Sequence, residues 1–387
     1  MELKVFTQQL EPLGIVDEAI SVIWQPSYWN IGRFDDVKLL APVTANNNEL
    51  LVKGNIVVLH GEPAEYSDEQ GEWRRAMQIT YRYITKDENG TEQIEIQGCF
   101  LKKWLSKRVL TTALILTGTN QNIINYLVSI SCGENAAATR RFENFKTLEQ
   151  ENLGGSSVEY TTVYGTDLGE AVYDRALSGK LGYDILVNER NKLYGFWLYK
   201  GKDMSTGNTQ GNTPCIFSRD FDNVTEQDYT ESIENVKNVC YCTSAADEND
   251  RVYALEVDNE GQTGIDRAEF YVDMASISWT TKDDSGQDVP ISYTQYMELM
   301  RTDANDKLDD YGETINFEST INTSKNLQYK QDFNVGDIVT TMEKNWGIRI
   351  DARITQISET WQDGKHTLEV TFGDSLPTLL DKIKKVR

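Results

Sequence analysis

The sequence contains little of the chemistry on which most enzymes depend. Its 387 residues include only two histidines, His60 and His366, and five cysteines. So few histidines argue against a metal site built on imidazole ligands, and an odd, sparse set of cysteines argues against a disulfide framework. The sequence also lacks the nucleophile-elbow, P-loop and dinucleotide-binding glycine motifs. We therefore predict that the protein is not an enzyme, with no catalytic residues, no metal ligands and no cofactor.

Long apolar segments are also missing. The longest apolar run, residues 109–116, is interrupted by Thr111 and Thr112 and is far shorter than the roughly 20 residues that span a bilayer. The first residues lack the basic and apolar regions of a signal peptide. We therefore expect synthesis in the cytoplasm and no membrane insertion by this chain.

Positive charge is scarce throughout the sequence. Lysine and arginine together number 38 against 61 aspartate and glutamate residues, so the net charge is −23. A general nucleic-acid binder needs a basic surface to displace counterions, and this composition argues against that class. Residues 220–269 contain 14 acidic and 3 basic residues, a net of 3 − 14 = −11, and almost half of the net charge therefore lies in this segment.

Alternation of apolar and polar residues dominates both ends of the chain. Residues 76–98 contain two alternating stretches that flank Asn89-Gly90, and residues 349–372 contain two more around Asp363-Gly364. Alternation around Asn-Gly or Asp-Gly is typical of β-hairpins. Many short strands separated by turns predict a small barrel or sandwich at each end.

The middle of the chain changes to a helical period. Residues 122–131 and 168–179 have apolar residues at helical spacing, with Thr166 as the predicted N-cap of the second helix. Residues 293–311 show the clearest amphipathic helix. We predict an α+β, mostly β protein. Its predicted parts are a β-barrel module at 1–107, an α/β lobe at 108–203, an acidic β-rich lobe ending in the long helix at 204–311, a second β-barrel module at 312–375 and a short helix or tail at 376–387.

Three local patterns have alternative interpretations. Cys240 and Cys242 share one face of a strand and are predicted to be buried thiols rather than metal ligands or a redox pair. The acidic segment 282–288 has a glycine like a calcium loop but lacks the final carboxylate ligand, and we predict a hairpin tip. Trp24 and its neighbouring aromatics are predicted to lie in the core or at a subunit interface, rather than on a sugar-binding platform.

Several short motifs occur in an order that resembles a known family. The N-terminal motif is Trp24, Tyr28, Trp29, Gly32 and Phe34; the first module ends with Gly98, Leu101 and Leu105; the C-terminal motif is Phe333, Gly336, Asp337 and Val339, with Gly373 after the last hairpin. Their order is similar to that in siphophage and prophage tail-hub proteins, a family of baseplate-hub and tail-associated minor structural proteins. The proteins of this family are in turn similar to the trimeric hubs of contractile-tail baseplates.

The resemblance implies a structural protein of the virion tail, made in the cytoplasm of the bacterial host. Such hubs form homotrimers in which each subunit supplies two barrels, so that a ring of six barrels surrounds a channel for DNA. The implied partners are other tail proteins, namely the distal tail ring, the tape measure and a tail fibre or spike. DNA would pass without specific binding, and an acidic channel would repel its phosphates.

Other functions remain open at this point. A carbohydrate-binding or host-receptor module would present a row of exposed aromatic side chains. A cell-wall hydrolase would need two carboxylates for acid-base work, and among 61 acidic residues no particular pair stands out. The sequence also does not separate a phage from a phage-derived injection particle.

Overall fold

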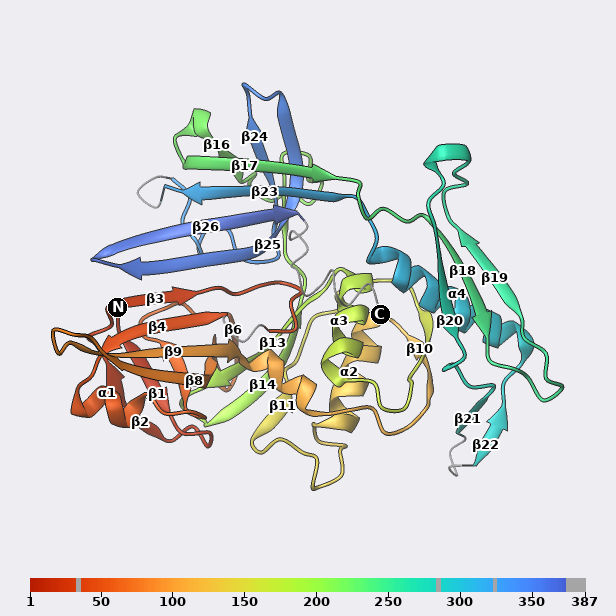
Figure 1. Ribbon diagram of the computed structural model, residues 1–387, viewed down its shortest axis with the longest axis horizontal. Helices are drawn as coiled ribbons and strands as arrows, with labels where there is room; N and C mark the ends of the chain where they lie inside the picture. The colour runs from red at the N-terminus through yellow and green to blue at the C-terminus, as the bar shows by residue number, and fades with distance from the viewer. Residues whose placement is uncertain (33–35, 283–286, 323–325, 374–387) are drawn as a thin grey trace.

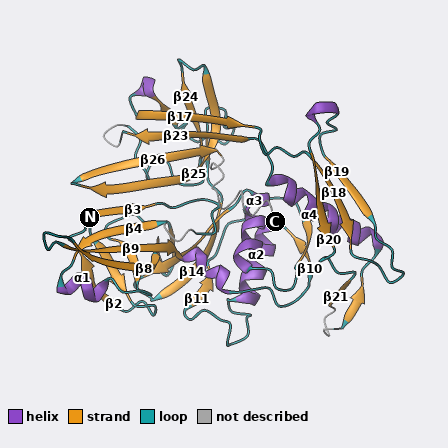
Figure 2. Ribbon diagram, viewed as in Figure 1, coloured by secondary structure: helices purple, strands orange, loops and turns teal. Residues whose placement is uncertain are grey.

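The computed structural model describes residues 1–32, 36–282, 287–322 and 326–373. Phe34, the acidic loop at 283–286 and the predicted tail at 376–387 lie outside these described residues. Strands predominate, and the longer helices gather in the centre and at the acidic lobe (Figure 2). The protein is α+β and mostly β, as its sequence predicts.

The N-terminal module is a curved antiparallel sheet. Its strands and helices are β1 (Leu3–Phe6), β2 (Pro12–Val16), β3 (Ser21–Trp24), β4 (Val37–Pro42), α1 (Ala45–Leu50), β5 (Ile56–Leu59), β8 (Met77–Lys86), β9 (Glu92–Phe100) and the 3-10 helix η1 (Leu101–Lys107). The hairpin predicted around Asn89-Gly90 is confirmed as β8 and β9. Strands β1 and β2 were not predicted.

The C-terminal module draws its strands from two separate parts of the sequence. They are β15 (Asp203–Met204), β16 (Ile216–Ser218), β17 (Val224–Ser232), β23 (Thr314–Ile321), β24 (Ile338–Glu343), β25 (Ile348–Gln362) and β26 (Lys365–Gly373), with the 3-10 helix η2 (Arg219–Phe221) after β16. The predicted Asp363-Gly364 hairpin is confirmed as β25 and β26. Strands β16 and β17 fall within the acidic lobe predicted at 204–311, but they pair with β24 and β23 of this module, and β15 also pairs with β24.

The α/β lobe contains two helices packed on a mixed sheet. Its elements are β6 (Tyr66–Asp68), β7 (Gly71–Arg75), β10 (Ile115–Gly118), α2 (Asn120–Ser131), β11 (Phe145–Thr147), β12 (Val158–Thr161), α3 (Leu168–Gly179), β13 (Gly182–Asn188) and β14 (Leu193–Tyr199). Its five-stranded sheet has the order β11-β14-β13-β7-β6, so β6 and β7 leave the N-terminal module and join the lobe. Strands β13 and β14 form its antiparallel hairpin.

The N-cap predicted for α3 is wrong by one residue. Asp167, not Thr166, accepts a hydrogen bond from the backbone N–H of Glu170, at 3.1 Å. An aspartate also places negative charge at the positive end of the helix, which threonine cannot do. The helix ends at Lys180, whose φ of 52° gives the left-handed conformation usually taken by glycine.

The acidic lobe is an insertion at the end of a hairpin. It contains β18 (Val239–Ser244), β19 (Ala254–Asp258), the 3-10 helix η3 (Gly264–Asp266), β20 (Glu269–Met274), β21 (Thr280–Lys282), β22 (Asp288–Pro290) and α4 (Tyr293–Asp309). Ser232 at the end of β17 pairs with Thr314 at the start of β23, so the chain leaves and re-enters the C-terminal module at paired residues. Helix α4 covers the inner face of the three-stranded sheet, and Cys240 and Cys242 are buried between them, as predicted.

The two β-modules are joined by one ladder of hydrogen bonds. Residues Glu359 to Gln362 of β25 pair antiparallel with Trp24 to Ser21 of β3. The resulting sheet follows the order β17-β23-β26-β25-β3-β4-β9-β8, from the top to the bottom of the left half of Figure 1, and continues through β5, β1 and β2. Two modules from opposite ends of the sequence therefore lie side by side in a single sheet.

Candidate functional site at the junction of the two β-modules

Tyr28 lies where the two β-modules and the α/β lobe meet. Its side chain is completely buried just after β3. The hydroxyl donates a hydrogen bond to the carbonyl oxygen of Lys180 at 3.0 Å and lies 3.4 Å from that of Tyr199. Burial raises the pKa of this phenol, an effect that nearby Arg353 opposes. Tyr28 is therefore a neutral anchor that ties the N-terminal module to the α/β lobe.

Glycines provide the space for the ring of Tyr28. A Cβ atom at Gly182 would lie 2.3 Å from this ring, and one at Gly336 would lie 2.4 Å from it. Gly336 also has a φ of +96°, which favours glycine for conformational reasons. Gly201 packs against the backbone of Gly336, so that the α/β lobe and the C-terminal module touch through main-chain atoms.

Arg353 of β25 closes the C-terminal side of this junction. Its guanidinium lies 5.0 Å from the ring centre of Tyr28 and 5.9 Å from that of Trp29, within the range of cation-π attraction. It also donates a hydrogen bond to the carbonyl oxygen of Gly336. One side chain of the C-terminal module thus covers two aromatic residues of the N-terminal motif.

Asp337 shapes the loop that contains Gly336. Its carboxylate accepts hydrogen bonds from the backbone N–H groups of Lys202, at 2.8 Å, and Asn334, at 2.7 Å. Burial raises the pKa of Asp337, and these hydrogen bonds oppose the rise. Phe333 and Val339 on either side are buried in the C-terminal core. The predicted C-terminal motif is therefore a rigid loop held against the α/β lobe.

The predicted motif residues divide into two groups. Tyr28, Trp29, Gly336 and Asp337 come together at the junction, although more than 300 residues separate the two pairs in the sequence. The remaining described residues act locally. Trp24 packs edge-on against Phe100 at 5.0 Å; Gly98 lies against Met77 and Gln78; Leu101 and Leu105 are buried beneath the α/β lobe; Gly32 and Gly373 have φ values of +94° and +83°. Their functional importance stays a prediction.

A buried ionic cluster lies beside the junction and was not predicted. Arg75 of β7 is buried and contacts Glu65 and Asp184, each at 2.8 Å. Burial alone would lower the pKa of Arg75, but the two carboxylates hold it well above its usual value. Lys330, in the loop before β24, contacts Glu65 at 3.8 Å, so the cluster also joins the C-terminal module to the rest.

Two aromatic rings, those of Trp361 in β25 and His366 in β26, pack beside the β25–β3 ladder. Trp361 packs against the N-terminal core and stacks on His366 with ring centres 4.8 Å apart. His366 lies 3.2 Å from the carboxylate of buried Glu359, whose backbone pairs with that of Trp24. One of the two histidines therefore has a structural position at the module junction.

Sequence reasoning missed Gly182, Gly201, Arg75 and Arg353. Each contributes through contact with residues distant in the sequence, and none stands in a recognisable local motif. A weak signal was available at residues 181–183, where glycine separates a helix from a buried strand.

The acidic lobe docks on the α/β lobe through carboxylates arranged around one arginine. Arg175 of α3 is completely buried, forms an ion pair with Asp306 of α4 and lies 4.7 Å from the ring centre of Tyr160. Burial raises the pKa of neighbouring Asp174 to about 6, although Lys307 lowers it, and burial also raises that of Asp303. This contact therefore carries more negative charge than it can neutralise.

Replacing Asp174 by asparagine is expected to stabilise the protein near pH 7.5. The raised pKa penalises the ionised carboxylate in the folded state, so native Asp174 contributes stability below about pH 4 that is lost as the pH rises through about 6. We expect Asp174→Asn to gain roughly 1–2 kcal/mol near pH 7.5 and clearly less near pH 4.5. Urea unfolding at both pH values tests this, and a gain independent of pH would contradict it.

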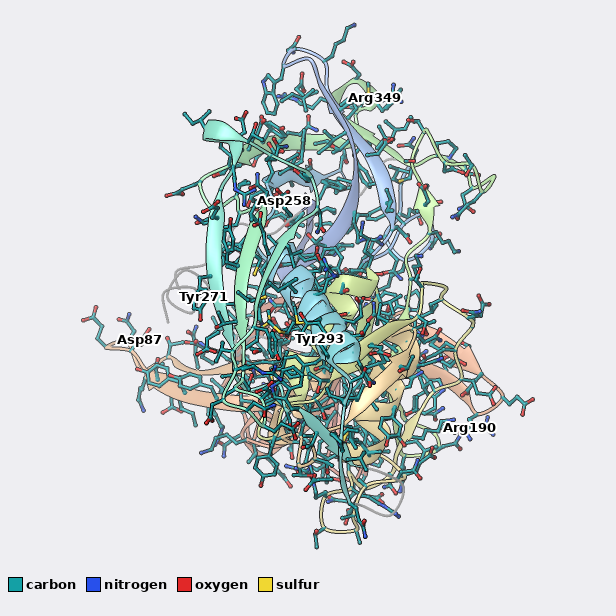
Figure 3. The ribbon with its side chains drawn as sticks, turned by 90° about the vertical axis from the view of Figure 1, so that its right-hand side faces the viewer. Asp87, Arg190, Asp258, Tyr271, Tyr293 and Arg349 are labelled. Carbon is teal, nitrogen blue, oxygen red and sulfur yellow. The ribbon has the colours of Figure 1, made fainter. Side chains whose placement is uncertain are left out.

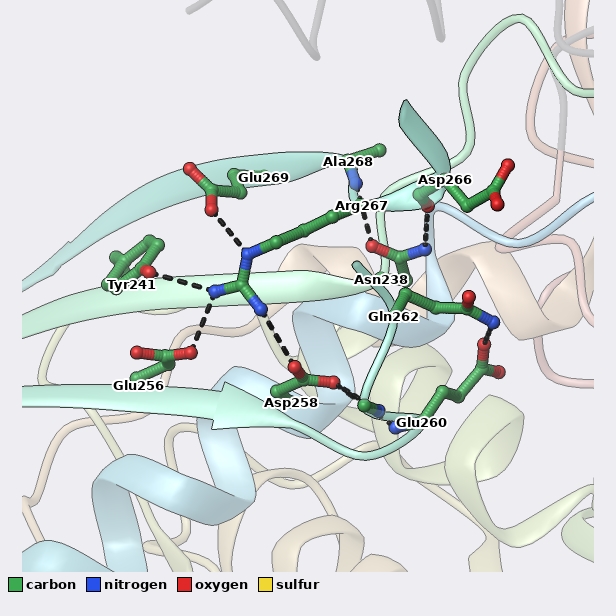
Figure 4. A network of polar contacts seen from close by, with 11 residues as sticks. Asn238, Tyr241, Glu256, Asp258, Glu260, Gln262, Asp266, Arg267, Ala268 and Glu269 are labelled. Carbon is green, nitrogen blue, oxygen red and sulfur yellow. Dashed lines mark hydrogen bonds and ion pairs between the residues drawn. The ribbon is translucent and has the colours of Figure 1, made fainter. Parts of the chain in front are cut away.

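Arg267 binds three carboxylates on the outer face of the acidic lobe. Its guanidinium donates hydrogen bonds to Glu269, Glu256, Asp258 and the hydroxyl of Tyr241, all within 2.6–2.8 Å (Figure 4). Tyr241 pairs in register with Tyr271, which is labelled on the outer face of the lobe in Figure 3. The described face therefore presents two tyrosines rather than a row of aromatic side chains.

The described part of the chain includes the cysteines, the flanks of the predicted acidic hairpin and the longer helices that the sequence predicts. All five cysteines lie in it, and all are buried free thiols. Across the described ranges, no three metal-ligating side chains are grouped as a metal site. Strands β21 and β22 pair up to Lys282 and Asp288, as expected for the flanks of the predicted hairpin, whose tip lies outside the described residues. No described helix is long and apolar enough to cross a membrane.

Comparison with solved structures identifies the fold as that of phage and prophage tail proteins. A tail protein from Neisseria meningitidis MC58 superposes with a TM-score of 0.55 at 10% identity, covering 96% of each chain. Prophage tail protein gp18 from Listeria monocytogenes EGD-e gives 0.53 at 11% identity, covering 100% of this chain and 98% of that one. The 43 kDa tail protein of prophage MuSo2 from Shewanella oneidensis gives 0.53 at 12% identity, covering 96% and 98%.

The sequence places the chain more narrowly among these tail proteins. Residues 2–374 match the model of the siphovirus ReqiPepy6 Gp37-like proteins, and the chain belongs to this family. A sequence comparison with curated proteins finds no match. The predicted resemblance to phage tail proteins is therefore confirmed.

Proposed function

We propose that this tail protein is the hub of the tail tip or baseplate. In this role three copies form a ring, and each copy contributes its two β-modules, so that six modules surround a channel. The ring joins the tail tube to the host-facing tip and lets DNA pass. The protein acts by assembly and not by catalysis.

The observation that carries this proposal is the ladder between β25 and β3. It joins the two modules side by side in one antiparallel sheet. Such a pair is a repeating unit, because the next pair can be added in the same direction by rotation about an axis. Three pairs would match a sixfold tube with a threefold ring.

The net charge of −23 suits a channel for DNA. Carboxylates facing the channel would repel phosphates and keep the genome from binding to the wall. The proposed partners are the distal tail ring, the tape measure and a fibre or spike. These proposed partners are components of a tail, and the solved structures described above that share this fold are also tail proteins.

The mass of the protein in solution tests the ring. Light scattering on a sizing column, over a range of concentrations, is expected to show a species of roughly 130 kDa, three times the chain mass of 44.0 kDa. Electron microscopy of this species should show a central hole. A protein that stays monomeric at every concentration and also in purified tails would contradict the proposal.

A further inference from the structure

The continuous sheet ends in two strand edges without a partner in the described chain. Strand β17 pairs only with β23, so its other edge is free over Val224–Ser232. Strand β8 pairs with β9 along its whole length, but on its other side β5 pairs only with Met77 and Gln78. Residues 80–86 of β8 therefore have no strand on that side within the described residues.

The two modules repeat the same arrangement of strands. The order β8-β9-β4-β3 in the N-terminal module corresponds to β25-β26-β23-β17 in the C-terminal module. Both long hairpins contain an irregularity at the equivalent position, between Ile79 and Tyr81 in β8 and between Ile354 and Gln356 in β25. Before this point each strand pairs within its own module, β8 with β5 and β25 with β24.

After the irregularity the two modules differ in one respect. The last residues of β25 pair with β3, which belongs to the other module. The equivalent part of β8 has no such neighbour. Since β17 occupies in its module the place of β3, the β17 of another copy is the strand that would repeat this arrangement beside β8.

Strand direction agrees with this arrangement. All seven neighbouring pairs from β17 to β8 are antiparallel, so these two outer strands of an eight-stranded series run in opposite directions. A second copy related by rotation about an axis keeps the direction of every strand relative to that axis. It therefore brings its β8 antiparallel to β17 of the first copy, as a regular ladder requires.

We propose that β17 of one copy pairs with residues 80–86 of β8 in the next copy. This proposal rests on the ring described above and names the surfaces that close it. The partner is a second copy of this chain. The junction repeats between subunits the β25–β3 ladder that each subunit contains.

The internal repeat also fixes the register of the pairing. Ile79 lies in one line across the sheet with Gly98, Val37 and Trp24, and Ile354 lies in one line with Phe372, Phe317 and Tyr229. Tyr229 is therefore the equivalent of Trp24. Glu359, five residues after Ile354, pairs with Trp24. Ile84, five residues after Ile79, should accordingly pair with Tyr229.

This register gives chemically matched neighbours. It places Ile84 opposite Tyr229, and Arg82, whose guanidinium also donates to Asn48 of its own subunit, opposite Glu231. Apolar and opposite-charge neighbours of these kinds stabilise antiparallel sheets. More broadly, β17 contains three acidic residues and no basic one, whereas residues 80–86 contain two basic residues and no acidic one. One like-charge pair, Asp87 with Glu226, falls beyond the end of β8.

The β8–β9 hairpin leaves apolar surface that such a neighbour would cover. Tyr81, Tyr83 and Ile84 are 44, 49 and 45% exposed. Figure 3 shows Asp87, at the tip of this hairpin, projecting away from the body of the subunit. A projecting strand with a free edge and exposed aromatic side chains is prone to pair with another chain.

Cysteine cross-linking tests both the contact and its register. The double variant Arg82→Cys/Glu231→Cys places one cysteine on each edge, and facing residues in an antiparallel ladder lie within reach of a disulfide. All five native cysteines are buried, so the new thiols are the exposed ones. Mild oxidation is expected to give covalent dimers and trimers on a non-reducing gel. The control Arg82→Cys/Thr225→Cys, six residues out of register, should lose nearly all of this product.

Charge reversal provides an independent measurement. Arg82→Glu and Glu231→Arg should each reduce the trimeric fraction in light scattering, and the combined variant should restore it. Rings that form while matched and mismatched cysteine pairs cross-link equally would overturn the strand pairing but leave the hub function intact. Matched cross-links that yield only open chains would support the pairing and contradict the closed ring.

Discussion

Gly201→Ala is expected to lower the free energy of unfolding by about 3 kcal/mol or more, or to prevent folding. A Cβ atom at this position would lie 1.8 Å from the carbonyl oxygen of Gly336. The carbonyl belongs to the main chain and the Cβ atom is bonded directly to it, so neither can turn away as the end of a flexible side chain could. The clash would separate the α/β lobe from the C-terminal module and disturb the packing around Tyr28.

Gly312→Ala is the matched control for this substitution. Gly312 also has an ordinary φ, and no atom lies within 4 Å of a Cβ built on it. Urea unfolding of the two variants should therefore show a large loss of stability for Gly201→Ala and almost none for Gly312→Ala. Equal midpoints for the two variants would show that the contact between Gly201 and Gly336 does not limit stability.

Arg75→Met is expected to cost roughly 3–5 kcal/mol near neutral pH. Arg75 contacts two buried carboxylates, Glu65 and Asp184, and its removal would leave both without their main cation. Thermal or urea unfolding near neutral pH measures this loss.

Two further variants separate charge from packing in this experiment. Arg190→Met removes an arginine from an exposed turn, labelled in Figure 3, and should leave stability nearly unchanged. The triple variant Arg75→Met/Glu65→Gln/Asp184→Asn removes the buried charges together and should recover much of the loss. A triple variant as unstable as Arg75→Met alone would show that packing, not charge, accounts for the effect.

Sequence patterns predicted the local structure better than the assembly of the domains. The β8–β9 and β25–β26 hairpins were predictable because Asn89-Gly90 and Asp363-Gly364 determine turns from adjacent residues. The pairing of β17 with β23 was not, because 81 residues of the acidic lobe, 233–313, separate two strands that each lack a diagnostic turn. Pairing between distant strands depends on how whole surfaces fit together, and the spacing of apolar residues within one segment does not indicate which distant strand it will pair with.

The same distinction applies to the module junction. Tyr28, Trp29 and Gly336 could be selected from the sequence only as members of motifs, and their meeting with Arg353 depends on the β25–β3 ladder. Burial of Arg75 was unpredictable for a similar reason, because its two carboxylate partners come from a loop and from β13. Charged residues in an alternating pattern usually face solvent, and only the docking of the lobes encloses this one.

The position of the acidic lobe has a consequence for how this protein can diverge. Since the lobe begins and ends beside the paired residues Ser232 and Thr314, a short turn could in principle span the same gap. The lobe is thus a separate insertion in the C-terminal module. It contacts the rest of the protein mainly through α4, for example where Asp306 forms an ion pair with Arg175. Natural variants could replace or lengthen it while the strands that join the two modules stay the same. Sequence change could then accumulate in one part of the chain without changing the architecture of the other.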